Sequence, residues 1–247
     1  MKKKIIRSVC IITAREGSKS IKKKNLLKIN GKPFIYYPIK AALNSKKIDL
    51  TFIDSDGDET LNLGKFYGCI KLKREKKFSK DNTPHLDVIN NAAKKILNKY
   101  RDVEFITILL GNCVFINSKI IDNGIALLNK NSEATSVTTV WKAQDDHPYR
   151  ALKINKAGYL NNFLNLKQKV SSDRHSYPDV YYYDQGPWII RSKNLKKCDG
   201  PAPWYWLGKK SLPIIRDWVT GKDVHSYLDI EFSKFYLNKL NTKFKNI

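Results

Sequence analysis

The chain has 247 residues, and 46 Lys and Arg against 23 Asp and Glu give it a formal net charge of +23. Hydrophobic residues make up 42% of the sequence and aromatic residues 11%, which is enough for a core and excludes an intrinsically disordered protein despite the charge. No apolar run approaches the roughly 18 residues of a membrane helix, so we expect a cytoplasmic protein with no membrane association.

Lysine dominates the basic residues, since only eight of them are arginine. Proteins that read nucleic acid depend on arginine, because its planar guanidinium makes paired hydrogen bonds to phosphates and bases. Lysines scattered along a whole sequence are more typical of a solvated surface. We therefore do not expect nucleic acid as the partner, although an RNA- or polyanion-binding protein without catalysis stays open as an alternative.

Short β-branched runs alternate with amphipathic segments in the first half of the sequence. This order is typical of a parallel sheet covered by helices. The expected strands are residues 5–12, 50–54, 69–72, 105–110 and 134–141, and the expected helices are 33–44, 59–67, 84–100 and 118–129. We predict an α/β fold with a doubly wound, mostly parallel sheet, forming a single domain over residues 1–247.

The pattern changes between residues 142 and 207, where short aromatic segments are broken by turns. Such a small β-rich insertion often forms a lid or a contact between subunits, and we expect 142–207 to be a lid or dimerisation region. Beyond it, the sequence predicts an extended segment at 214–219 and a last helix at 229–240.

The loop after the first strand carries the strongest chemical signal. Residues 13–25 combine Arg15, Gly17, Ser18 and a run of lysines that ends at Lys24. A loop at the carboxyl end of a strand in an α/β sheet lies where ligands bind, and glycine, hydroxyl and cations together suit a polyphosphate. The loop matches neither the P-loop nor the dinucleotide fingerprint, and a solvated basic turn is the alternative interpretation.

This loop and later segments resemble one enzyme family. Arg-x-Gly-Ser-Lys-x-Ile-x-x-Lys-Asn at 15–25, followed by Gly-Lys-Pro at 31–33, is similar to the opening of the acylneuraminate (CMP-sialic acid) cytidylyltransferases and their legionaminate and pseudaminate relatives. The segments at 52–59, 74–81, 183–188 and 229–231 resemble later motifs of that family in the same order. The resemblance implies a nucleotide-diphospho-sugar transferase-like fold and a homodimer.

The resemblance also implies roles for individual residues. The positions that would hold the phosphates and sugar of CTP are Arg15, Gly17, Ser18, Lys24 and Asn25, with Arg74 helping to hold the nucleotide. Asp229 and Glu231 would bind Mg²⁺, and Arg15, Lys24 and Asp229 would be the catalytic set. Two carboxylates in an extended stretch point to the same side and can share one ion. The alternative is that Asp229 caps the helix and Glu231 interacts favourably with the helix dipole.

The acceptor side departs from the family pattern. Residues 110–117 read Leu-Gly-Asn-Cys-Val-Phe-Ile-Asn, where the family often has a glutamine and an arginine, so N-acetylneuraminate itself is not assumed as the acceptor. Asn112 is a candidate polar contact there, Asp184 and Gln185 are candidates in the aromatic region, and Arg150 could pair with a sugar carboxylate.

The resulting functional hypothesis is transfer of a cytidylyl group from CTP to a 2-keto sugar acid of sialic, legionaminic or pseudaminic type, with Mg²⁺, giving a CMP-sugar and pyrophosphate. Two further alternatives stay open besides the polyanion-binding protein. One is activation of ketodeoxyoctonate, or use of a different nucleotide, on the same fold. The other is a family member that binds nucleotide without catalysis.

Overall fold

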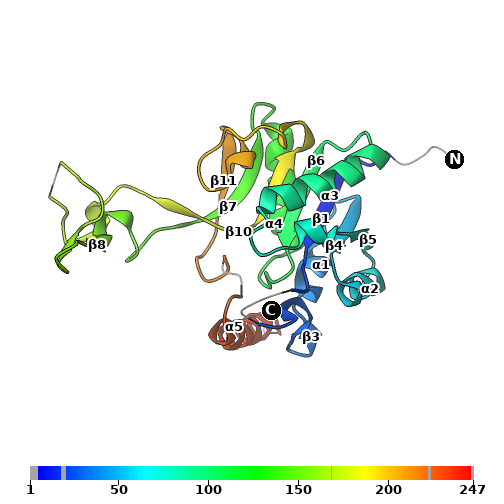
Figure 1. Cartoon of the computed structure of the whole chain (residues 1–247), viewed down its shortest axis with the longest axis horizontal. Coiled ribbons are helices and arrows are strands. Elements are labelled where there is room, and N and C mark those ends of the chain that lie inside the picture. The colour runs from blue at the N-terminus through cyan, green and yellow to red at the C-terminus, as the bar shows by residue number, and fades with distance from the viewer. Residues whose placement is uncertain (1–4, 18–20, 168, 222–223, 246–247) are drawn as a thin grey trace.

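The computed structural model describes residues 5–17, 21–167, 169–221 and 224–245. Within these residues a seven-stranded sheet has the strand order β11-β7-β10-β6-β1-β4-β5 (Figure 1). The strands of this sheet are β1 (Ser8–Thr13), β4 (Leu50–Ser55), β5 (Ile70–Lys73), β6 (Phe105–Leu110), β7 (Ser136–Lys142), β10 (Tyr181–Arg191) and β11 (Ser211–Ile215). Strand β10 is antiparallel to both of its neighbours, and the other recorded pairings in the sheet are parallel.

The helices alternate with the first strands along the chain. They are α1 (Tyr36–Leu43), α2 (Asp58–Phe66), α3 (His85–Lys99), α4 (Ser118–Lys130) and α5 (Tyr227–Lys245). The five strands and four helices expected in the first half of the sequence are confirmed, with their ends displaced by a few residues. The α/β class with a mostly parallel sheet is confirmed with them.

The sheet divides the core into two layers, because successive side chains of a strand point to opposite faces. In β1, Cys10 and Ile12 join the cluster formed with α1, α2 and α4, whereas Val9 and Ile11 join the cluster formed with α3. A central strand buried on both faces explains the continuous apolar run that marked β1 in the sequence.

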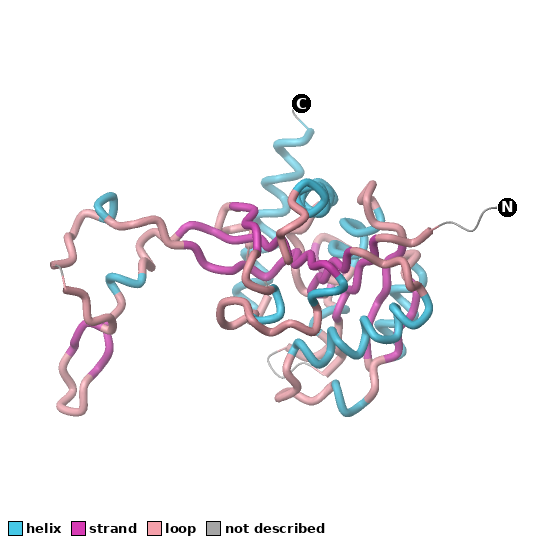
Figure 2. The backbone as a smooth tube through the Cα atoms, turned by 90° about the horizontal axis from the view of Figure 1, so that it is seen from above, coloured by secondary structure: helices cyan, strands magenta, loops and turns pink. Residues whose placement is uncertain are grey.

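A long arm leaves the main body between β7 and β10 (Figures 1 and 2). The arm carries the hairpin of β8 (Leu152–Ile154) and β9 (Leu160–Asn162), which forms its own two-stranded sheet. The sequence predicts an insertion over residues 142–207, and these bounds are too wide. Strand β10 lies inside the central sheet, and Leu195 and Trp206 pack in the core on the α3 face. The projecting part is therefore residues 143–180, and its role as a lid or subunit contact stays a prediction.

The C-terminal helix packs away from the main core. Ile230 of α5 and Val224 before it join Ile29 and Phe34 in a third cluster, beside the small hairpin of β2 (Lys28–Ile29) and β3 (Lys32–Pro33). This packing brings the segment before α5 back to the loop that follows β1. Among the described residues, no helix is long and apolar enough to cross a bilayer.

Candidate active site

A cavity of about 240 Å³ opens at the carboxyl ends of the parallel strands β1 and β6. Its polar and charged lining consists of Thr13, Arg15, Lys24, Asn25, Arg74, Lys80, Asp81, Thr83, His85 and Asn112. This edge is where an open α/β sheet places its ligands, because the loops diverge there and leave a crevice. The structure thus brings Arg15, Lys24, Asn25, Arg74 and Asn112, which the sequence singled out, into one site.

The loop after β1 is held in shape by its own polar groups. Asn25 is buried and donates from Nδ2 to the carbonyl oxygen of Arg15 at 3.0 Å. Glu16 accepts from the backbone N–H of Thr60 at 2.8 Å, which ties the loop to the start of α2. Among the described residues, nothing lies within 4 Å of the place that a Cβ would take on Gly17, and Ser18 lies outside these residues.

Arg15 and Lys24 supply positive charge to the cavity. Arg15 Nη1 lies 2.5 Å from Asp81 Oδ1, and both side chains are about one-third exposed. Lys24 Nζ donates to the carbonyl oxygen of Val224 at 2.5 Å, and the same oxygen accepts from Asn112 Nδ2 at 3.1 Å. Val224 therefore joins the loop after β1, the end of β6 and the approach to α5.

Arg74 lies at the base of the site in a buried ion pair with Asp54. Its Nη2 is 2.6 Å from Asp54 Oδ2, and its Nε donates to the same oxygen at 2.8 Å. Burial raises the pKa of the Asp54 carboxyl, and the guanidinium of Arg74 opposes that rise. Because the pair spans the ends of β4 and β5, it fixes a cation beside the cavity with little freedom to move.

Gly111 is required by the close approach of two loops. A Cβ there would lie 2.8 Å from the Cβ of Ala14 and 3.1 Å from Asn25 Oδ1. Because neither neighbour can move without disturbing the loop after β1, a larger residue at the end of β6 would push that loop out of place.

His85 is a site residue that the sequence reasoning missed. It begins α3, and its Nε2 lies 3.3 Å from the hydroxyl of Thr13. Burial, with the charge of Arg74 as a second cause, lowers the pKa of His85 to about 4. The sequence offered one indication of a site residue, because His85 stands at the start of an expected helix just beyond the segment 74–81. Nothing local in the sequence showed that its ring faces β1.

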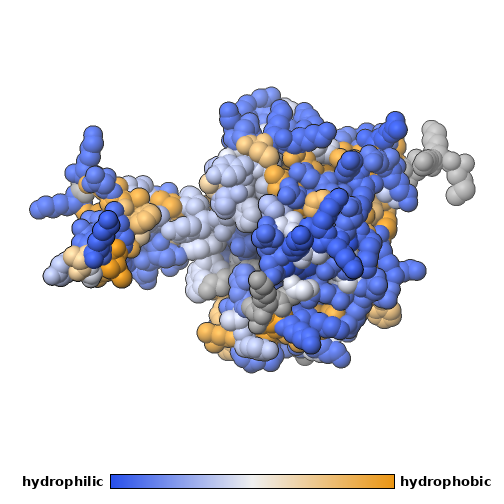
Figure 3. Space-filling view, viewed as in Figure 1, coloured by the Kyte–Doolittle hydropathy of each residue, from blue (hydrophilic) through white to orange (hydrophobic). Residues whose placement is uncertain are grey.

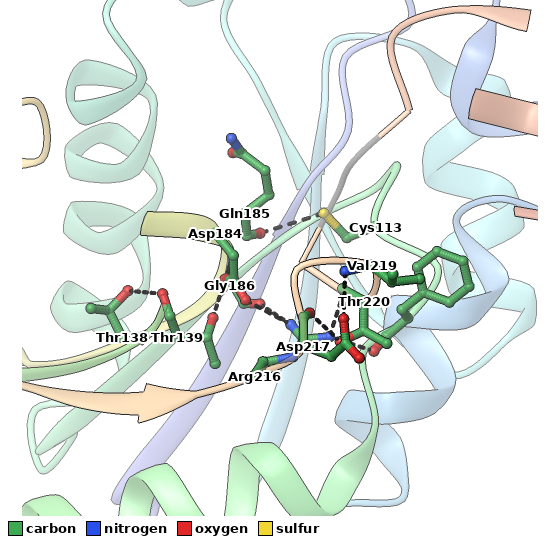
Figure 4. Close-up of polar contacts among 11 residues, drawn as sticks. Cys113, Thr138, Thr139, Asp184, Gln185, Gly186, Arg216, Asp217, Val219 and Thr220 are labelled. Carbon is green, nitrogen blue, oxygen red and sulfur yellow. Dashed lines mark hydrogen bonds and ion pairs between the residues drawn. The ribbon is translucent and has the colours of Figure 1, made fainter. Parts of the chain in front are cut away.

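The carboxylate of Asp184 is surrounded by hydrogen-bond donors of the protein itself (Figure 4). Its carboxylate accepts from the hydroxyl of Thr139, from the backbone N–H of Gly186 and from Arg216 Nη1, and the residue is buried. Burial raises the pKa of Asp184, and Arg216 opposes the rise. The expected contact with substrate does not fit a carboxylate that these three donors already satisfy.

Gln185 and Arg150 lie at different places. The carbonyl oxygen of Gln185 accepts from the thiol of Cys113, and its backbone N–H donates to Gly221, while its side chain points away from the Asp184–Arg216 pair in Figure 4. Arg150 is on the projecting arm, pairs with Asp145 at 3.2 Å, and is absent from the cavity lining. Within one chain, the structure does not bring Arg150 to the site.

Asp229 and Glu231 do not share a side, contrary to the expectation for an extended stretch. Both lie in α5, where residues two apart are separated by about 200° around the helix axis. Asp229 Oδ2 accepts from the backbone N–H groups of His225 and Ser226 at 2.9 and 2.7 Å, and Glu231 pairs with Lys234 at 2.6 Å. The capping interpretation of Asp229 is the one that the geometry bears out, and neither carboxylate lines the cavity.

Comparisons with known proteins identify the family of the chain. Residues 9–178 match the family model described as cytidylyltransferase. The pseudaminic acid cytidylyltransferase of Campylobacter jejuni is 25% identical over 250 residues, covering 96% of this chain and 98% of that protein. A Helicobacter pylori protein, pseudaminic acid cytidylyltransferase and UDP-2,4-diacetamido-2,4,6-trideoxy-beta-L-altropyranose hydrolase, is 33% identical over 183 residues, which are 73% of this chain and 34% of that protein.

Solved structures show the same fold. The CMP:2-keto-3-deoxy-manno-octonic acid synthetase, determined as a complex with CTP, aligns with a TM-score of 0.69 at 14% identity over 94% of this chain and 99% of that one. The 4-diphosphocytidyl-2C-methyl-D-erythritol synthase of Anaerococcus prevotii aligns with a TM-score of 0.62 at 16% identity over 94% of this chain and 96% of that one. From the family match over residues 9–178, the chain belongs to the cytidylyltransferase family.

Proposed function

We propose that this protein transfers the cytidylyl group of CTP to a 2-keto sugar acid of the sialic, legionaminic or pseudaminic type, in the cytoplasm. The observation that carries the proposal is the cavity in which Arg15, Lys24 and Arg74 meet at the carboxyl edge of a sheet with the family's fold. With Lys80, four cationic side chains line the cavity and suit a triphosphate. Relatives named for pseudaminic, legionaminic and N-acylneuraminic acids suit an acidic sugar as the acceptor.

In this reaction the anomeric hydroxyl of the sugar acid attacks the α-phosphorus of CTP. A new P–O bond forms, the bond to the β-phosphate oxygen breaks, pyrophosphate leaves, and the hydroxyl proton is released. The site must stabilise negative charge on the phosphate oxygens. Lys24 and Arg15, which line the cavity, would do so. A phosphate group would replace Asp81 as the partner of Arg15, whose side chain is 35% exposed.

Mg²⁺ belongs to the proposal with a smaller ligand set than the sequence indicated. Among the described residues no group of three or more His, Cys, Asp or Glu could hold a metal ion. Mg²⁺ is compatible with this, because it commonly takes one or two carboxylates and completes its shell with substrate phosphates and water. Asp229 is kept as the proposed carboxylate because the family resemblance implies it, although its Oδ2 accepts the hydrogen bonds of the helix cap. Glu231, on another side of α5, is not kept. The bound ion would neutralise charge on the triphosphate.

A homodimer is also part of the proposal, and the arm supports it. The β8–β9 hairpin exposes a group of apolar side chains: Leu152, Ile154, Tyr159, Leu160 and Phe163. Apolar residues gather on the arm in Figure 3. Such a patch on a segment far from the chain's own core is typical of a surface that another protein covers.

The nucleotide part of the proposal is tested by calorimetric titration of CTP into Lys24→Ala. Loss of a hydrogen bond to a charged group should weaken CTP binding about 10- to 100-fold. Lys28→Ala is the matched control, because Lys28 is exposed on β2, outside the cavity, and should leave the affinity unchanged. Equal CTP affinity in Lys24→Ala and the control would contradict the phosphate site.

The acceptor is identified by assaying pyrophosphate release with a panel of sugar acids. Turnover with pseudaminic, legionaminic or N-acetylneuraminic acid supports the proposed substrate class, and turnover with ketodeoxyoctonate alone replaces it. Steeply salt-dependent RNA binding without CTP turnover would instead favour the polyanion-binding alternative. CTP binding without release of pyrophosphate on any acceptor would indicate a family member that has lost catalysis.

A further inference from the structure

The cavity is lined by the imidazole of His85 and by the apolar side chains of Phe78, Val88 and Leu110 as well as by cations. Lys24 and Asn112 approach it from the side of Val224 and α5. His85 approaches from the α3 side, where its ring contacts Trp188 and Trp204 edge-on, at centroid distances of 5.7 and 6.3 Å. Phosphates are held by cations, so the uncharged lining groups suit the remaining part of a nucleotide, its base and ribose.

The contacts of the Thr13 hydroxyl favour one of two tautomers of His85, and we adopt the tautomer in which Thr13 donates to Leu109. The Thr13 hydroxyl has one hydrogen, and its oxygen lies 3.5 Å from the carbonyl oxygen of Leu109, which can only accept. When that hydrogen is donated to Leu109, the hydroxyl oxygen is left to accept from His85 Nε2, at 3.3 Å. The proton of the neutral imidazole then resides on Nε2, and Nδ1 keeps its lone pair.

The surroundings of the ring keep it uncharged at neutral pH. Burial against the tryptophans, with Arg74 as the charged neighbour, lowers the pKa of His85 to about 4. An imidazole that is neutral and has its donor engaged offers a ligand one hydrogen-bond acceptor. A phosphate gains nothing from that acceptor, whereas an amino group does.

We propose that His85 is a specificity-determining residue that selects cytosine over uracil, with Nδ1 accepting a hydrogen bond from the exocyclic amine of the base. Uracil carries a carbonyl oxygen at the same position, so two lone pairs would face each other in the cavity. A site that pairs a buried polar group with one ligand rejects the analogue that leaves it unpaired. The inference rests on the proposed function, since it assumes a nucleotide in this cavity.

The test is the ratio of dissociation constants for CTP and UTP, measured by calorimetry on the full chain with Mg²⁺. His85→Phe keeps an aromatic ring against Trp188 and Trp204 but has no acceptor. It should weaken CTP binding about tenfold and leave UTP binding unchanged or tighter, because the repulsion with the uracil carbonyl is removed. His85→Asn offers an amide oxygen near the position of Nδ1 and should restore most of the preference for CTP.

Two results would overturn the assignment of His85. One is a His85→Phe variant that keeps the wild-type ratio of CTP to UTP affinity, since a packing role predicts that result. The other is a nitrogen NMR spectrum with the His85 proton on Nδ1; the chain has only four histidines, and the variants identify the signal. A wild-type protein that binds neither nucleotide would instead contradict the proposed function, so the two failures are distinguishable.

Discussion

Arg216 holds three separate parts of the chain together through one guanidinium. Its Nη1 donates to Asp184 Oδ2 and to the carbonyl oxygen of Gly186, and its Nη2 donates to the carbonyl oxygens of Phe115 and Thr220 (Figure 4). The side chain is 6% exposed, so these bonds are sheltered from water. A guanidinium has five N–H donors on three nitrogens in a fixed plane, whereas an ammonium group has three donors on one nitrogen and cannot match the four acceptors around Arg216.

Arg216→Lys should therefore lower the free energy of unfolding by about 3 kcal/mol, because it leaves buried acceptors without donors and weakens the ion pair with Asp184. Urea denaturation measures the change. Arg150→Lys is the matched control: Arg150 is exposed and has a surface ion pair with Asp145, and we expect a change below about 0.5 kcal/mol. Similar losses of unfolding free energy in both variants would show that the buried hydrogen bonds of Arg216 stabilise the protein no more than a surface ion pair does.

The sequence predicted correctly that residues following one strand would lie together at one site, while their roles stay predictions. Arg15, Lys24 and Asn25 follow β1 closely, and the ends of parallel strands share one edge, so the sequence predicts that they meet. It failed for Asp184, because the partner, Arg216, is 32 residues away and only the folded sheet brings them together. His85 was missed for the same reason, since its contact with Thr13 spans 72 residues.

At the scale of elements, helix α5 starts with a reciprocal cap. Ser226 precedes the first helical residue, its backbone N–H and hydroxyl donate to Asp229 Oδ2, and the backbone N–H of Asp229 donates back to the Ser226 hydroxyl at 3.3 Å. This arrangement satisfies N–H groups that a helix start leaves open. Asp229 thus has a structural role whether or not it also holds a metal ion.

Two variants distinguish the role of Asp229 as a helix cap from its proposed role as a Mg²⁺ ligand. Asp229→Asn keeps an oxygen for the cap but removes the charge, whereas Asp229→Ala removes both and should cost about 1 kcal/mol of stability. If the carboxylate holds Mg²⁺, both variants should lose Mg²⁺-dependent pyrophosphate release. Full activity in Asp229→Asn, with a destabilised Asp229→Ala, would leave Asp229 as a cap alone.

The order of the strands within the sheet was the part of the fold that could least be predicted from the sequence. Runs of β-branched residues mark strands, and amphipathic runs mark helices, so the individual elements were predicted closely. Which strands become neighbours depends on pairing between distant segments. Strand β10 was assigned to an insertion, yet it lies between β6 and β7 with Trp188 fully buried, because its apolar half fits the centre of the sheet.

At the scale of the whole molecule, the projecting arm carries the exposed apolar patch of the β8–β9 hairpin away from the main body. Ile154 and Leu160 are directly opposite one another in the β8–β9 hairpin and are 73% and 67% exposed. Leaving such residues in water is unfavourable by roughly 1.5–3 kcal/mol for each side chain relative to burial. A second copy of the chain that covers the hairpin would recover that free energy.

The double variant Ile154→Lys with Leu160→Lys should convert the proposed dimer to monomers, because it places two charges in the contact. Sedimentation equilibrium measures the change in mass. Lys153→Ser is the control: Lys153 lies in the same strand, on the opposite face of the hairpin, and should leave the mass unchanged. A monomeric wild-type protein, or a double variant of unchanged mass, would place the subunit contact elsewhere or nowhere.

The place of β10 also governs the order in which the sheet can be completed during synthesis on the ribosome. Strand β7 pairs with β10 and β11, both of which follow it in the chain. The edge of β6 that β10 will cover is likewise unpaired until residues 188–191 emerge, about 80 residues after β6 itself. A nascent chain in which β1 and β6 have already paired therefore carries an open, apolar sheet edge. That edge must be shielded from other chains until β10 is synthesised.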